Sequence, residues 1–227
     1  WDTPHGVPPF DKILPEHFMP AFERGMSLHE AEIDAITSNK DEATFENTIL
    51  AYDNAGQMLA QTELVFGMLC AAETNDRMQA LQEQAMPLLA AHRDKIRLDD
   101  KLFVRVKEVY DRRAALGLDA EQMRLLQKTY DSFVRAGALL DAEQKARLKE
   151  INGQLSLTAV KFGNNILAEN NNFVLELKSD ELDGLPAGIR DAAREKAQQM
   201  GKGDKWVFTL HKPSLIPLLT YSTRRDL

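Results

Sequence analysis

Apolar residues recur along most of this chain at spacings of three, four or seven positions, which places them on one face of an α-helix. Five such faces lie between residues 45 and 166. In chain order they are Phe45, Ile49, Tyr52, Gly56, Leu59 and Phe66; Met78, Leu81, Ala85, Leu88, His92 and Ile96; Phe103, Val106 and Tyr110; Met123, Leu126, Tyr130, Phe133 and Gly137; and Leu148, Ile151, Leu155, Phe162 and Ile166. The pattern predicts a mainly α fold, an antiparallel helical bundle that buries these faces. We expect Phe45, Ile49, Phe133 and Phe162 to be among the buried residues.

Proline placement divides the chain. Five of the nine prolines lie in residues 1–20, which we expect to form an extended leader against the body. Residues 21–172 form the predicted helical body, in which Pro87 is expected to bend its helix. Because the first residue is Trp1 and not Met, we also expect residues to precede it in the complete protein.

Two helix starts carry the same capping pattern, Asp119-Ala-Glu-Gln122 and Asp141-Ala-Glu-Gln144. An Asp at the N-cap with Gln three residues later satisfies free amide donors from both directions. A third copy at that spacing is missing, so the pattern favours shared capping chemistry over a repeat architecture.

The pattern changes after Asn170-Asn171-Asn172, which is typical of a helix end and turn. Residues 173–177 and 205–210 alternate like strands, and residues 189–200 have helical spacing. Residues 173–227 are therefore predicted to be a small α/β segment near the C-terminus. Ser222 or Thr223 is expected to cap a helix of which residues 224–227 are the first turn, so that this segment is truncated.

Composition narrows the possible functions. The chain has 227 residues, 44% hydrophobic and 28% charged, with a net charge of −7. Its Lys and Arg are scattered beside Asp and Glu, which is typical of solvated helix faces and argues against nucleic acid as a partner. We find no apolar run of the about 18 residues that span a bilayer and no signal peptide, so we expect no membrane partner. Cytoplasmic and periplasmic locations both stay open.

Candidate catalytic residues are few. A zinc peptidase of the His-Glu-x-x-His type needs two His four positions apart on one helix face, with the Glu activating water. His29-Glu30 begins that pattern, but Ile33 stands where the second His is required. We interpret His29-Glu30 as a surface pair and predict no catalytic and no metal-binding residue in this chain.

Other candidates are weighed against structural explanations. His17 and His92 are interpreted as packed residues, and Cys70 as a buried, inert thiol. The Gly201-Lys-Gly203 segment lacks the third glycine and the preceding strand of a dinucleotide site and is interpreted as a turn. Trp206 and His211 could line a peptide channel, but a core Trp and an exposed strand end are favoured, and substrate-binding residues stay unknown.

Eight segments in order resemble the thimet oligopeptidase and peptidyl-dipeptidase family of zinc peptidases. They are Pro9–Ile13 with Pro15–Phe18, Thr44–Ile49, Thr74–Asp76, Tyr110–Arg113, Phe133–Gly137, Lys149–Asn152, Leu182–Pro186 and Trp206–Leu210. The segment Trp1–Pro4 favours the peptidyl-dipeptidase branch. This resemblance implies a two-lobed helical enzyme with a deep channel, zinc as cofactor, and short peptides as substrates from which C-terminal dipeptides are released.

The resemblance implies that this chain is the N-terminal lobe of such an enzyme. The zinc ligands and the catalytic base of the family lie in a C-terminal catalytic lobe, which is then the partner of this chain. We expect the 227-residue segment alone to be inactive and to wall the substrate channel, with an apolar patch around residues 206–221. The alternative is a non-catalytic helical protein-interaction module.

Overall fold

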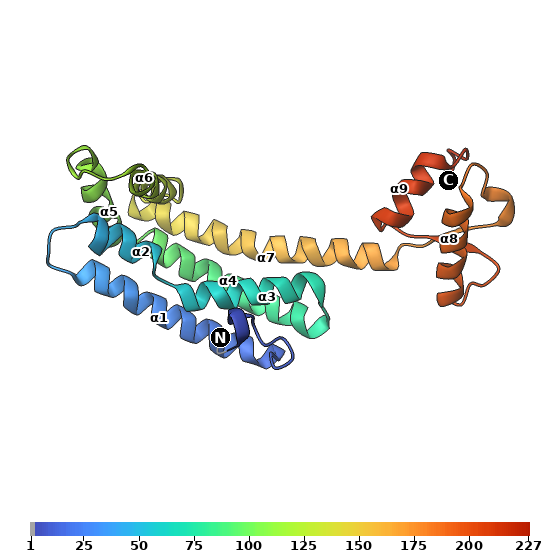
Figure 1. Ribbon diagram of the computed structural model, residues 1–227, viewed down its shortest axis with the longest axis horizontal. Coiled ribbons are helices and arrows are strands. Elements are labelled where there is room, and N and C mark those ends of the chain that lie inside the picture. The colour runs from blue at the N-terminus through green and yellow to red at the C-terminus, as the bar shows by residue number, and fades with distance from the viewer. Residues whose placement is uncertain (1–2) are drawn as a thin grey trace. The chain divides into compact units, whose positions relative to one another are not determined.

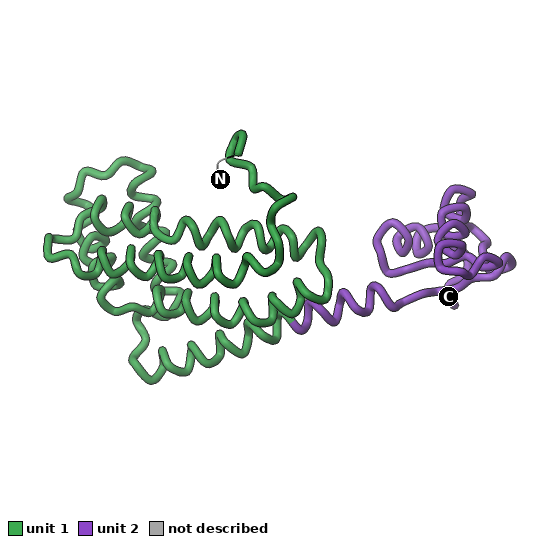
Figure 2. Tube along the Cα trace, turned by 90° about the horizontal axis from the view of Figure 1, so that it is seen from below, with its two compact units in different colours: residues 1–160 green, residues 161–227 purple. Residues whose placement is uncertain are grey.

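The computed structural model describes residues 3–227. Trp1 and Asp2, which belong to the predicted leader, lie outside the described residues. The chain forms two compact units that divide between Val160 and Lys161 (Figure 2). This division falls inside a long helix, α7, and not after Asn172, where the sequence pattern changes.

The first unit is helical. Its helices are α1 (Phe18–Ser38), α2 (Ala51–Asp53), α3 (Gln57–Ala72), α4 (Asp76–Arg97), α5 (Asp100–Asp111), α6 (Ala120–Arg135) and the first part of α7 (Ala142–Asn172), with 3-10 turns η1 (Pro4–Gly6), η2 (Pro15–His17) and η4 (Arg113–Ala115) and a π-helical turn η3 (Phe45–Leu50). Helix α1 packs along α3 and α4, while α5 packs on α6 and η3 (Figure 1). The mainly α fold is confirmed. The predicted leader contains two 3-10 turns, and α1 begins at Phe18, before Pro20.

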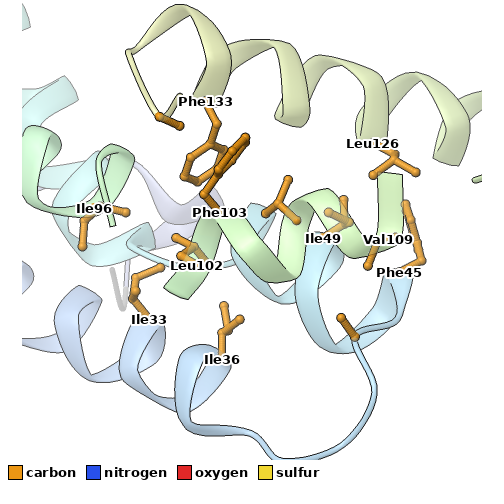
Figure 3. Close-up of a cluster of buried hydrophobic side chains, with 13 residues drawn as sticks. Ile33, Ile36, Phe45, Ile49, Ile96, Leu102, Phe103, Val109, Leu126 and Phe133 are labelled. Atoms are coloured by element: carbon orange, nitrogen blue, oxygen red, sulfur yellow. The ribbon is translucent and has the colours of Figure 1, made fainter. Parts of the chain in front are cut away.

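Two hydrophobic cores stabilise this unit. The first joins α1, η3, α4, α5 and α6 and contains Ile33, Ile36, Ala43, Phe45, Ile49, Ile96, Leu102, Phe103, Val106, Val109, Leu126, Phe133 and Ala138 (Figure 3). The second joins α1, α3 and α4 and contains Phe18, Phe22, Leu59, Val65, Phe66, Met78, Ala85 and Leu89. The predicted burial of Phe45, Ile49 and Phe133 is confirmed. Leu88 is exposed, and its neighbour Leu89 is buried instead.

The first predicted helix, from residue 45 to residue 66, is broken at Gly56, so this prediction was wrong. Gly56 has φ 74°, a left-handed conformation that glycine adopts at little cost. Its backbone N–H donates to the Glu32 carboxylate over 2.7 Å. A Cβ at this position would lie 2.9 Å from His29 Nδ1. The turn separates Ile49, in the first core, from Leu59, in the second.

Both predicted capping boxes are present. The Asp119 carboxylate accepts from the Gln122 backbone over 2.9 Å, and the Gln122 side chain accepts from the Asp119 backbone over 3.1 Å. Asp141 and Gln144 make the same pair of bonds over 2.8 and 3.2 Å. Local chemistry therefore fixes where α6 and α7 begin.

A buried arginine holds the segment between α1 and η3. Arg105 is 9% exposed, and its Nη1 donates to the carbonyl oxygens of Asn39 and Asp41 over 3.0 and 3.1 Å. Its Nη2 donates to Asn47 Oδ1 over 3.1 Å. The guanidinium thus replaces the backbone partners that this irregular segment lacks.

The apolar face of α7 is exposed, so the predicted burial of the fifth apolar face was wrong. Within this 31-residue helix only Lys145 and Val160 are buried. Phe162 is 66% exposed and Leu155 62%, and Ile151 and Ile166 are exposed as well. Periodicity identifies an apolar face, but it does not supply a neighbour that covers the face.

The second unit is a small α/β segment, as predicted. Strands β1 (Leu175–Leu177) and β2 (Trp206–Phe208) pair antiparallel, and helices α8 (Ala187–Gln199) and α9 (Lys212–Tyr221) follow β1 and β2 in turn, with a 3-10 turn η5 (Ser179–Glu181) before α8. Its core contains Leu177, Leu182, Leu185, Ala193, Phe208 and Leu218. Ser222 ends α9 and does not start a further helix, so the helix predicted from residue 224 is absent from the described residues.

Candidate functional site

Two histidines from different helices form the polar cluster that the sequence did not predict. His29 lies on α1 and His92 on α4, and their Nδ1 and Nε2 atoms are 3.0 Å apart. Glu30 Oε1 lies 3.5 Å from His92 Nδ1, and Glu30 Oε2 lies 2.8 Å from Lys95 Nζ. The cluster joins the two helices at a place where His92 is only 5% exposed.

The charges around the cluster favour one arrangement of its protons. Glu30 is a carboxylate beside Lys95, so a His92 Nδ1–H pointing toward it is favoured over a lone pair. His92 Nε2 is then an acceptor, and His29 Nδ1–H donates to it. At 3.5 Å, Glu30 Oε1 is too far from His92 Nδ1 for a good hydrogen bond, and within residues 3–227 His92 Nδ1 has no other partner.

Burial favours the neutral form of both imidazoles. Burial lowers the pKa of His29, and the neighbouring His92 lowers it further. Burial also lowers the pKa of His92, against the opposing effect of Glu30. The hydrogen bond from Lys95 lowers the pKa of Glu30. Protonation of either ring would place a positive charge in a half-buried site beside the other ring, and burial disfavours the charged form.

The histidine cluster opens onto a shallow cleft of about 470 Å³. The cleft is lined by His29, Ala55, Gly56, Leu59, Ala60, Glu63, Leu64, His92 and Arg93. Arg93 pairs with Glu63 over 3.1 Å at its edge. The cleft offers imidazole groups and an apolar wall, which suits a contact surface or proton exchange better than nucleophilic catalysis.

The histidine cluster does not fit zinc. A catalytic zinc needs three protein ligands whose donor atoms converge on one point. Here His29 and His92 point their nitrogens at each other, and Glu30 approaches the opposite nitrogen of His92. Among residues 3–227, no group of three or more His, Cys, Asp or Glu is arranged to hold a metal ion. His29 was predicted as a surface residue and is half-buried instead.

The other sequence candidates lie apart from this cluster. His17 is exposed, accepts a hydrogen bond from the Leu14 backbone over 3.2 Å, and borders an apolar cleft of about 370 Å³. Cys70 is half-buried, and burial raises the pKa of its thiol, which disfavours a nucleophile. Gly201 adopts φ 71° in a turn.

Trp206 and His211 lie in the second unit. Trp206 is half-buried on β2, with the Arg194 guanidinium 5.4 Å from its ring centroid. His211 is exposed at the N-cap of α9. Residues 3–227 contain no helix with the length and hydropathy that a bilayer crossing requires.

The predicted resemblance to peptidases is confirmed by comparison with known proteins. The chain is 37% identical over 229 residues to dipeptidyl carboxypeptidase of Escherichia coli, with 99% of this chain and 34% of that protein covered. It is 35% identical to dipeptidyl carboxypeptidase of Salmonella typhimurium over the same shares. It is 24% identical to oligopeptidase A of Escherichia coli, over 99% of this chain and 33% of that protein. No family model matches the chain.

This chain is therefore similar to peptidases. Among them, it is more similar to dipeptidyl carboxypeptidase, at 37% identity, than to oligopeptidase A, at 24%. The chain spans about a third of the length of these curated relatives.

Proposed function

We propose that this chain is the N-terminal, non-catalytic lobe of a zinc metallopeptidase that acts on short peptides and releases C-terminal dipeptides. The observation that supports this most is the 37% identity to dipeptidyl carboxypeptidase over 99% of the chain. The chain spans 34% of that protein, which leaves ample length for a catalytic lobe. The zinc ligands and the general base are assigned to that lobe.

The outer face of α7 supports a partner of this kind. Leu155 and Phe162 are more than half exposed, and Ile151 and Ile166 share their helix face because the four residues follow a spacing of four, seven and four. Contiguous apolar surface is seldom left exposed by a soluble protein and usually marks an interface. We assign this face to contact with the remainder of the same protein.

The second unit offers further apolar surface within the predicted patch. Ile216, Leu219 and Tyr221 on α9 are exposed, whereas Trp206 on β2 is half-buried. The three α9 residues supply a second candidate contact for the catalytic lobe. The substrate channel, in this proposal, is walled by the helical lobe and closed by the catalytic lobe.

The proposal is tested by comparing the complete gene product with the 227-residue chain. Both are assayed on a short peptide with a blocked N-terminus, and released dipeptides are separated by chromatography. We expect the complete product to release C-terminal dipeptides, chelator to abolish the reaction, and the chain alone to release none. A complete product without peptidase activity, or an active 227-residue chain, would overturn the proposal.

The alternative function, a helical protein-interaction module without an enzyme, is favoured by the same exposed face on α7. The reading frame that encodes the chain separates the two. A frame that continues beyond Leu227 into a His-Glu-x-x-His motif supports the peptidase, and a stop codon directly after Leu227 supports the interaction module.

A further inference from the structure

A basic cleft lies along α6, outside the histidine cluster. Arg124, Lys128 and Arg135 of α6 and Arg97 of α4 surround an open volume of about 610 Å³. All four side chains are exposed. The remaining lining residues are Asp131, Ser132 and Ala136. The cleft therefore gathers four cations around one carboxylate.

This local charge is opposite to that of the whole chain. The sequence has 35 acidic against 28 basic residues, yet the ion pairs of residues 3–227 include none of the four cations. Burial, the larger effect, raises the pKa of the Tyr52 phenol, and Arg97 lies close enough to that phenol to lower it. Asp131 accepts from the Gln127 amide over 2.9 Å.

Two of the four cations are neighbours on α6. Arg124 and Lys128 are four positions apart, so they are neighbours on the helix surface and repel each other. An acidic residue at either position would have formed a stabilising pair instead. A bound anion would offset the repulsion and add counter-charge to the single carboxylate, Asp131, that lines the cleft.

We propose that this cleft binds a small ligand with linked phosphate groups. Three of its four cations are arginines, whose planar guanidinium groups match phosphate oxygens in bidentate hydrogen bonds. The Ser132 hydroxyl adds a neutral donor at the same surface. The volume is within the range of small-ligand sites, about 300–1,000 Å³. This site is independent of the proposed peptidase function, because none of its lining residues lies on the apolar faces of α7 and α9 that support that proposal.

Binding is measured by isothermal titration calorimetry of the purified chain at low ionic strength, with inorganic tripolyphosphate as the probe. We expect saturable binding to one site that weakens as salt is added. A nucleoside triphosphate is titrated in parallel. Equal affinity for the two probes shows that the phosphate chain alone is recognised, and tighter nucleotide binding shows that the nucleoside adds contacts; either result supports the site.

The variant Arg124→Gln with Lys128→Gln removes two of the four cations from exposed positions. We expect it to bind tripolyphosphate about tenfold more weakly or worse, because each charge-assisted hydrogen bond contributes substantially. The matched control is Arg190→Gln with Lys161→Gln, which removes the same two residue types from exposed positions outside the cleft. This control should keep its affinity within about twofold. Circular dichroism checks that both variants keep their helical content.

A third variant tests the sign of the charge effect. Asp131→Asn removes the one carboxylate of the cleft while an amide oxygen can still accept from Gln127. We expect tighter binding of tripolyphosphate. The proposal is overturned if tripolyphosphate shows no saturable binding, if the control variant loses as much affinity as the cleft variant, or if an oligoglutamate peptide binds the cleft more tightly than tripolyphosphate.

Discussion

His29 Nδ1 and His92 Nε2 lie 3.0 Å apart and join α1 to α4. The bond requires one ring to donate and the other to accept, so it exists only while at least one of the rings is neutral. The pair therefore links the packing of two helices to pH.

The stability of the first unit should fall when the pH is lowered through the histidine range. In the folded chain the pKa values of His29 and His92 are below their usual 6.5 because of burial. Below that value the unfolded chain takes up protons that the folded chain does not, so the free energy of unfolding decreases as pH falls from 6.5 toward the folded pKa values. The slope is at most about 1.4 kcal/mol per pH unit for each histidine.

Urea denaturation between pH 5 and 8 measures this slope. His92→Gln should flatten the profile, because it removes one titrating ring and leaves an amide in the cluster. His211→Gln is the control, since His211 is exposed at the start of α9. An unchanged profile in His92→Gln would show that the pair does not control the acid sensitivity.

Replacing Gly56 should strain the turn that breaks the first helix. Gly56→Ala places a Cβ 2.9 Å from His29 Nδ1 on a backbone with φ 74°, and should lower the free energy of unfolding by about 1–3 kcal/mol. Gly153→Ala is the matched control on α7, where a Cβ meets nothing within 4 Å. That variant should be stabilised by about 0.5–1 kcal/mol. In urea denaturation, we expect the midpoint of Gly56→Ala to fall and the midpoint of Gly153→Ala to rise relative to the unchanged chain.

How far sequence predicts this fold depends on whether the determining contacts are local. The capping box of Asp119 and Gln122 is complete within four residues, and it was predicted correctly. The break at Gly56 was missed because apolar spacing continues from Tyr52 to Leu59 across it. The bond between Glu32 and Gly56 that fixes the turn comes from another helix.

The candidate site was less predictable than the fold. His29 and His92 are separated by 63 positions, and no periodicity in a single sequence indicates that they meet. Phe162 has the same helical spacing as Phe133, yet only Phe133 has a neighbouring helix to cover it. A pattern of apolar residues identifies a face, whereas its burial depends on which other part of the protein lies against it.

These two phenylalanines make a matched pair of variants. Phe133 is 0% exposed, and it stacks against Phe103 with ring centroids 6.1 Å apart, so Phe133→Ala should cost about 3–5 kcal/mol. Phe162 is 66% exposed, and Phe162→Ala in the 227-residue chain should change stability by about 0.5 kcal/mol or less. Thermal denaturation measures both.

If the chain is one lobe of a longer protein, as proposed, the result for Phe162 should differ in that protein. If the remainder of the protein covers α7, Phe162→Ala removes a buried aromatic ring there and should cost at least about 2 kcal/mol. An equal, small effect in the chain and in the complete protein would place the contact elsewhere.

Removing the buried Arg105 should loosen the segment between α1 and η3. Arg105→Met keeps much of the side-chain volume but loses three hydrogen bonds, to Asn39, Asp41 and Asn47. We expect a loss of about 2–3 kcal/mol in the free energy of unfolding. Arg190→Met, at an exposed position on α8, should be near neutral. Equal midpoints for the two variants in urea would contradict a structural role for Arg105.

We propose that this chain belongs to a zinc peptidase whose metal is held outside these 227 residues. Calorimetric titration with zinc, run on metal-free complete gene product and on the purified 227-residue chain, tests it most directly. The account predicts tight binding of one zinc ion by each complete molecule and no tight binding by the chain alone. Stoichiometric, submicromolar binding of zinc by the chain itself would contradict it.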